Sequence, residues 1–399
     1  MTEIMITRQP IYDRRERAAG YDIRFRPTTD GSDPLAVSLL NGSLEVISSG
    51  LPVWVGVSEA QVLNRVLTTP GNSAIVAMIP AAMEPTPEVL QGLEAMHAAG
   101  VVLAIEEFYP PLGADDPMHQ LLALARYARI DARAHAAASF RAATQAAKAA
   151  GLLTVADLVF DRAAYTSCQQ AGCDYFLGAH FSRPELLPSA SLPTSTIAAL
   201  QVLSLARDEK TTERDLEEAI SNDPSVTFQL LRIVNSASIG GRGIESVGHA
   251  LRLTGRNTLI RWLALATFAS RADQSGVSAE ITGQAVRRAY IAEGLAKLST
   301  GRDPKTAFLV GLFSLIDAVF RIPMSEVVER INLASEVREA LLDRTGPYAD
   351  LLQFIECYEL GQWESAVATA QEMGVDADAA SGLYLTAVAE SRALLSSAA

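Results

Sequence analysis

Short apolar runs alternate with helical patterns along the first 180 or so residues of the chain. The runs are rich in β-branched residues and too short for helices, so each predicts a buried strand. The predicted strands are Ile4–Gln9, Gly20–Phe25, Pro52–Ser58, Ala74–Ile79, Val101–Glu107, Ala128–Asp131, Leu152–Asp157 and Tyr175–Ala179.

From the third strand onward, helical patterns such as Pro87–Ala98 and Ala134–Ala149 separate the strands. Repeated strand–helix units indicate a parallel sheet, and eight strands in this length fit a closed α/β barrel. The first two strands are too close in sequence for a helical crossover. We therefore predict an irregular barrel that begins with an antiparallel hairpin.

After Pro184–Ile197, a stretch rich in proline and serine that reads as a linker, the pattern becomes helical throughout. Asp223 and Ser246 are predicted helix N-caps, and Gly255 is a predicted helix stop. Further helices are predicted at Arg261–Ser270, Ala279–Leu298, Thr306–Phe320 and Met324–Leu342, with two or three more in Tyr348–Ser397. The predicted domains are residues 1–186, the barrel, and 187–399, an all-α domain.

The charge and composition of the chain exclude some classes of function. The formal net charge of −13 opposes nonspecific binding to nucleic acids and anionic membranes. Arg252, Arg256 and Arg261 are the only candidates for a local basic patch. No secretory signal or membrane-spanning run is recognised, so we expect a cytoplasmic protein. Cys168 and Cys173 lack zinc-knuckle spacing, and with Cys357 they read as ordinary thiols.

Two adjacent glutamates, Glu106 and Glu107, stand where the predicted strand in "GVVLAIEEFYPP" ends. Carboxylates at such a strand end are suited to holding a divalent cation. They are equally compatible with a solvated strand end or with the remnant of a lost site, and the residues alone leave these alternatives open.

Several motifs in the first half resemble the EAL phosphodiesterase domain, which hydrolyses cyclic di-GMP. They are "RQPIYDRRERAAGYDIRFR", "LAIEEFY", "ARID", "VADLVF" and "LGAHFSRP", in the family's order. The second half resembles the HDOD domain, a helical relative of the HD metal-phosphohydrolases, on "LLRIVNSASIGGRGIESVGHALRLTGRNTLIRWLAL". The resemblance implies a two-domain EAL–HDOD signalling protein.

The EAL resemblance implies a site for two divalent cations, and it assigns each family position to a residue here. Four acids remain as vestigial metal-site positions: Asp22, Glu106, Glu107 and Asp157. Five family positions carry other residues: Gly56, Ala77, Arg129, Phe160 and Leu177. Ligand loss of this extent predicts a dismantled metal site, with no catalytic residue, metal or cofactor.

The HDOD resemblance implies a domain without metal ligands. None of His97, His119, His135, His180 and His249 precedes an aspartate, and "GLFSLID" offers Ser314 and Leu315 where the His-Asp pair would lie. "NSASIGGRG" is a candidate recognition loop.

We therefore predict a non-catalytic signal-transduction protein, with the barrel as sensor or docking face and the HDOD half as a protein-interaction platform. A residual cyclic di-GMP phosphodiesterase is the alternative. Protein partners are expected but unidentified, and nucleic acid and membranes are not. Gln9, Pro10 and Arg26 match family positions that face the nucleotide, so cyclic di-GMP binding stays open, as does a homodimer.

Overall fold

The computed structural model describes residues 5–28, 31–68, 74–111, 113, 116–133, 137–182, 194–205, 210–235, 243–272, 276–330 and 333–398. These divide into two compact units, one ending at 182 and the other beginning at 194. The predicted domain boundary at 186 and most of the predicted linker lie outside the described residues. The described end of that linker is helical from Thr194.

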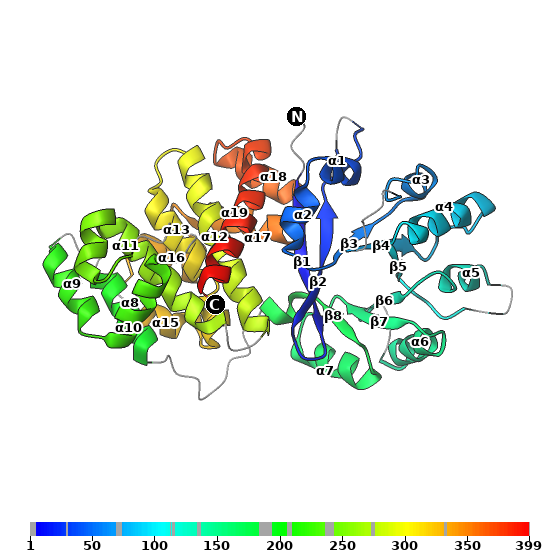
Figure 1. Ribbon diagram of the computed structural model, residues 1–399, viewed down its shortest axis with the longest axis horizontal. Helices are drawn as coiled ribbons and strands as arrows, with labels where there is room; N and C mark the ends of the chain where they lie inside the picture. Colours follow the sequence, from blue (N-terminus) through cyan, green and yellow to red (C-terminus); the bar gives the residue numbers. More distant parts are fainter. Residues whose placement is uncertain are drawn as a thin grey trace. The chain divides into compact units, whose positions relative to one another are not determined.

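The first unit, here the barrel unit, is a closed barrel in the strand order β1 to β8 (Figure 1). Its strands are β1 (Ile6–Asp13), β2 (Ala18–Phe25), β3 (Val53–Gly56), β4 (Ile75–Pro80), β5 (Val102–Glu106), β6 (Tyr127–Asp131), β7 (Leu153–Asp157) and β8 (Tyr175–Leu177). β1 pairs antiparallel with both β2 and β8, and every other pairing is parallel. The predicted α/β barrel with a hairpin at its start is confirmed.

Helices connect the parallel strands and lie outside the barrel (Figure 1). They are α1 (Pro34–Leu40), α2 (Ser43–Ser48), α3 (Glu59–Leu63), α4 (Pro87–Ala98), α5 (Met118–Leu122), α6 (Ala137–Ala149), α7 (Arg162–Ala171) and the 3₁₀ turn η1 (Ala179–Ser182). α4 has the predicted bounds, because Thr86 caps its first turn and Pro87 opens it.

The second unit, here the helical unit, contains α8 (Thr194–Leu205), α9 (Glu213–Ser221), α10 (Pro224–Val234), α11 (Val247–Ala272), α12 (Gly276–Leu298), α13 (Pro304–Phe313), α14 (Ile316–Phe320), α15 (Met324–Arg330), α16 (Ser335–Leu342), α17 (Ala349–Glu359), α18 (Trp363–Glu372) and α19 (Ala377–Ala398). Asp223 and Ser246 cap α10 and α11 as predicted, because their side chains accept from Val226 N and His249 N. α12 packs against α13, α17 and α19, which places the last helices in the same core.

Two long predicted helices are wrong in extent. The run predicted at 306–320 is divided into α13 and α14 at Ser314 and Leu315, and the run at 324–342 is divided into α15 and α16. At Gly255 the backbone leaves the helical region (φ 75°, ψ 164°), as the predicted stop requires, and α11 then resumes at once. That region is essentially restricted to glycine.

Candidate functional site

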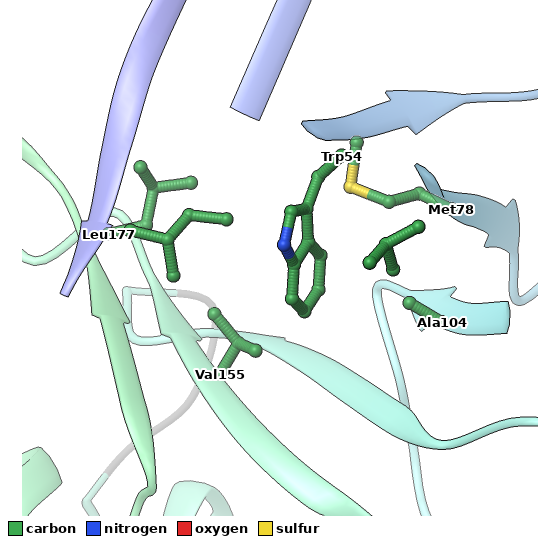
Figure 2. Close-up of a cluster of buried hydrophobic side chains, with 7 residues drawn as sticks. Trp54, Met78, Ala104, Val155 and Leu177 are labelled. Carbon is green, nitrogen blue, oxygen red and sulfur yellow. The ribbon is translucent and has the colours of Figure 1, made fainter. Parts of the chain in front are cut away.

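The barrel interior contains an apolar layer that supports the candidate site. It consists of Ile11, Trp54, Val76, Met78, Ala104, Val155 and Leu177, all buried. Figure 2 shows the Trp54 ring between Leu177 and Val155 on one side and Met78 and Ala104 on the other. This layer fills the centre of the barrel, so a functional site has to lie at one of the two barrel ends.

The candidate site lies one layer further along the strands, toward their carboxyl ends. Side chains alternate along a strand, so residues two apart share a face. Gly56 follows Trp54 by two positions, Glu106 follows Ala104, and Asp157 follows Val155. Arg129 likewise follows Tyr127, which packs against the apolar layer. Gly56, Glu106, Arg129 and Asp157 therefore face the same end of the barrel interior.

Arg129 is the centre of this site. Its Nε and Nη2 atoms lie 2.9 and 2.8 Å from Asp157 Oδ2. Its Nη1 atom donates to Asp22 Oδ1 at 3.0 Å and lies 3.6 Å from Glu106 Oε1. We call these four residues the Arg129 cluster. Arg129 is 5% exposed, so three strands contribute carboxylates to one buried cation.

Two further side chains, those of Met78 and Arg24, contact the cluster. Met78 Sδ accepts from Arg129 Nη1 at 2.9 Å, and Arg24 Nε donates to Asp22 Oδ2 at 3.3 Å. Neither was singled out from the sequence. Met78 corrects the assignment of Ala77 to this site: Val76 and Met78 both face the interior, so alternation turns Ala77 to the outer face of β4. The sequence indicates this through the alternation of side chains in "IVAMIP": Val76 and Met78 are two positions apart and share a face, and Ala77 between them lies on the other.

Burial dominates the electrostatics of the cluster. It raises the pKa of Glu106 and of Asp157, and the charge of Arg129 acts in the opposite direction on both. Burial also lowers the pKa of Arg129, but Asp22, Asp157 and Glu106 more than offset this and raise it above its ordinary value. The guanidinium therefore stays charged at every physiological pH.

The raised pKa of Glu106 gives a prediction. Protonation is easier in the folded chain than in the unfolded one, so wild-type stability falls as pH rises above about 4.5, the ordinary value. Glu106→Gln should therefore be more stable than wild type at neutral pH, and this advantage should shrink as pH falls toward 4.5 and be absent below it. The side chain is 33% exposed, so the gain should stay below about 1 kcal/mol.

Urea unfolding at several pH values checks this expectation. Glu107→Gln removes the same charge from an exposed neighbour and is the matched control. A Glu106→Gln chain that loses stability at neutral pH would contradict it.

The adjacent glutamates do not form a pair of ligands. Glu106 points toward Arg129, whereas Glu107 is exposed and has left-handed backbone (φ 54°). Phe160, another expected replacement, lies under the Arg133 guanidinium at 5.3 Å from its ring centroid. Leu177 belongs to the apolar layer.

The three residues with an expected nucleotide role are not all on one face. Gln9 is opposite Asp22 in the β1–β2 register, so both face the barrel interior. Pro10 is the next residue and faces outward. Arg26 follows β2, and its Nη1 lies 3.3 Å from Met5 Sδ.

The described residues do not fit the two-cation site that the resemblance implies. Mg²⁺ and Ca²⁺ need oxygen ligands at about 2.0–2.6 Å, but the carboxylates here surround a guanidinium. Gly56 has no side chain, and the Met78 thioether is a soft ligand. Within the described ranges, no group of three His, Cys, Asp or Glu is placed to hold a metal ion.

In the helical unit, the buried Arg288 contacts Ser314, which lies where the family's His-Asp pair is expected. Arg288 donates from Nη2 to Glu359 Oε2 at 2.7 Å and from Nη1 to Ser314 Oγ at 3.2 Å. Ser314 Oγ donates in turn to Gly311 O at 2.7 Å. Ser314 thus takes part in a polar contact among α12, α13 and α17.

The arginines of the candidate basic patch make separate local contacts. Arg256 Nη1 donates to Thr211 O at 2.6 Å. Arg261 Nη1 lies 2.9 Å from Glu293 Oε2, and its guanidinium lies over the Phe308 ring at 4.2 Å. Arg252 is exposed. Two of the three arginines therefore stabilise the helical unit itself.

Asn235 closes the ends of the candidate recognition loop. Its Nδ2 donates to Ile244 O and its Oδ1 accepts from Ile244 N, both at 2.7 Å. Residues 236–242, most of the loop, lie outside the described part of the chain.

The other histidines and cysteines considered in the sequence show contacts or burial that indicate a structural role. His180 stacks on Tyr165, and His119 Nε2 lies 3.0 Å from Gly113 O; His135 is outside the described residues. Burial raises the pKa of Cys168 to about 12, so its thiol stays protonated and unreactive. In the described part of the chain, no helix is both long and apolar enough to span a bilayer.

Known proteins resemble this chain along its length. The HDOD domain family matches residues 192–343. The chain is 26% identical over 401 residues to YuxH of Bacillus subtilis, covering 96% of this chain and 97% of YuxH. It is 23% identical over 389 residues to the cyclic di-GMP phosphodiesterase CdgJ of Vibrio cholerae, covering 93% and 88%.

Among solved structures, an EAL domain protein of Listeria monocytogenes is similar to the chain, with a TM-score of 0.37 and 14% identity, over 46% of this chain and 88% of that one. Residues 192–343 match the HDOD domain, and an eight-stranded barrel precedes them. The chain therefore has the predicted order, an eight-stranded α/β barrel followed by a helical region that matches the HDOD domain.

Proposed function

We propose that this protein is a non-catalytic component of cyclic di-GMP signalling. In this proposal the barrel is a sensor or docking face, and the HDOD domain is a platform for protein partners. The observation that carries the proposal is the Arg129 cluster, in which one guanidinium pairs with three carboxylates. The cluster lies at the barrel end toward the carboxyl ends of the strands, here called the barrel mouth.

Loss of hydrolysis follows from the chemistry of that cluster. Phosphodiester hydrolysis at such a mouth needs metal ions to polarise the phosphate and to lower the pKa of the attacking water. The carboxylates that could hold them are paired with Arg129, and an arginine does not lose its proton to act as a base. Gly56 and Met78 supply no hard ligand in their place.

A residual phosphodiesterase is the second candidate. It is favoured by the 23% identity to CdgJ, which extends over 93% of the chain. It is also favoured by Asp22, Glu106 and Asp157, three acids that remain at one end of the barrel.

A hydrolysis assay separates the two candidates. The purified full chain with Mg²⁺ or Mn²⁺ should produce linear dinucleotide at least about a thousandfold more slowly than one turnover per second, a typical enzyme rate. CdgJ assayed alongside is the positive control. Turnover at an ordinary rate that is lost on Glu106→Ala would overturn the proposal. Any heat of cyclic di-GMP binding in a calorimetric titration should be the same in EDTA as in Mg²⁺.

A further inference from the structure

We propose that the Arg129 guanidinium is a built-in cation that replaces a divalent metal ion at the barrel mouth. It holds Asp22, Glu106 and Asp157 together, so the barrel does not depend on divalent cations for its stability. Removal of the guanidinium should leave a site that accepts a small external cation. This assignment rests on the proposed loss of the metal site and explains how the barrel tolerates that loss.

The geometry supports a cation role rather than a simple ion pair. The guanidinium contacts carboxylates from β2, β5 and β7 at 2.8–3.6 Å, while β6 supplies the arginine. One group therefore connects strands that are not all neighbours in the barrel. A single planar fork can do this because its nitrogens point in different directions.

The surrounding charges make the cation necessary. Asp22 and Arg129 have side chains 2% and 6% exposed, and that of Asp157 is 14% exposed. Carboxylates buried this deeply are costly without a partner, because water no longer screens them from one another. Arg24 contacts Asp22 at the longer distance of 3.3 Å, and its own side chain is 35% exposed. Arg129 is therefore the one described cation that contacts all three acids.

The test is hydrogen exchange of the β5, β6 and β7 amides in the full chain. Arg129→Ala should speed their exchange by about 100-fold or more, since a buried ion cluster loses its only shared partner. About 10 mM guanidinium should slow that exchange about tenfold if it binds with a Kd near 1 mM. Urea, which has a similar shape and no charge, should not. Wild type already holds a guanidinium in this position, so it should respond to neither guanidinium nor Mg²⁺.

Three further variants serve as controls. Arg129→Met fills the space without a charge, so it should exchange quickly and gain nothing from guanidinium. Arg24→Ala removes the more exposed arginine and should have little effect. Arg129→Lys retains a charge with one point of contact, so it should be intermediate and unaffected by Mg²⁺; it gives a reading if Arg129→Ala does not fold.

Equal slowing of Arg129→Ala by urea and guanidinium would overturn the built-in cation, as would wild-type exchange that slows in Mg²⁺. So would an Arg129→Ala chain that exchanges like wild type, or an Arg129→Lys chain that exchanges as fast as Arg129→Met. These outcomes are independent of the hydrolysis assay. A wild type that binds Mg²⁺ without hydrolysing cyclic di-GMP would refute the cation role alone, and a wild type that hydrolyses it would refute the proposed function.

Discussion

Arg288→Met should lower the free energy of unfolding of the helical unit by about 3–5 kcal/mol, because it leaves a buried carboxylate without its partner. Glu359 has a side chain 10% exposed and accepts from both Nε and Nη2 of Arg288. Gln284 Nε2 also donates to Glu359, but it carries no charge. Urea unfolding followed by far-ultraviolet circular dichroism measures the loss.

A double variant tests the cause. Arg288→Met combined with Glu359→Met removes both charges and should recover most of the lost stability, since apolar residues often replace a buried ion pair without cost. Arg344→Met is the control, because the Arg344–Glu356 pair is exposed and should contribute less than about 1 kcal/mol. A double variant no more stable than the single one would show that packing of Arg288 matters more than its charge.

Gly178→Ala should destabilise the barrel unit by at least about 3 kcal/mol. A Cβ at this position would lie 2.2 Å from Val159 O and 2.4 Å from Val159 N, both backbone atoms that cannot swing aside. The backbone φ of 153° adds strain for any residue with a side chain. Val159 N donates to Leu177 O, so the clash acts where β8 ends.

Gly56→Ala is the matched control for Gly178→Ala, since Gly56 also lies at the barrel mouth. A Cβ there meets nothing within 4 Å, so the substitution should change stability by less than about 1 kcal/mol. Hydrogen exchange of the β7 and β8 amides, measured in both variants, reports the loss of stability near Gly178 itself. Similar protection in both would mean that the chain near Val159 moves to accept the methyl group.

The barrel was predictable from the sequence because each strand is a short apolar run with its own boundaries. β1 was the exception: the prediction ended at Gln9, but the strand continues to Asp13. Pro10 suggested an end because it lacks an N–H group. It is tolerated because β8 pairs with β1 only from Ile11 onward, so Pro10 has a single neighbouring strand.

The site was predictable as a set of residue types but not as an arrangement. The sequence identified Asp22, Glu106, Arg129 and Asp157, yet their convergence on one guanidinium depends on the register of four strands. Ala77 was assigned by resemblance one position away from Met78, and in a strand one position changes the face.

Tertiary contacts also explain why the long helix predicted at 306–320 was wrong. The apolar pattern continues through Ser314, but the Ser314 hydroxyl bonds to Gly311 O and to Arg288 of another helix. α13 ends at Phe313, next to this contact, and nothing in the local sequence announces the Arg288 partner.

The side-chain bridge between Asn235 and Ile244 has a consequence for how α10 and α11 are held together. Two hydrogen bonds of 2.7 Å join the end of α10 to the segment that leads into α11. Both ends of the intervening chain are therefore anchored by a contact that does not involve residues 236–242. The junction between α10 and α11 therefore depends on a single side chain, and substitution of Asn235 alone would remove both bonds.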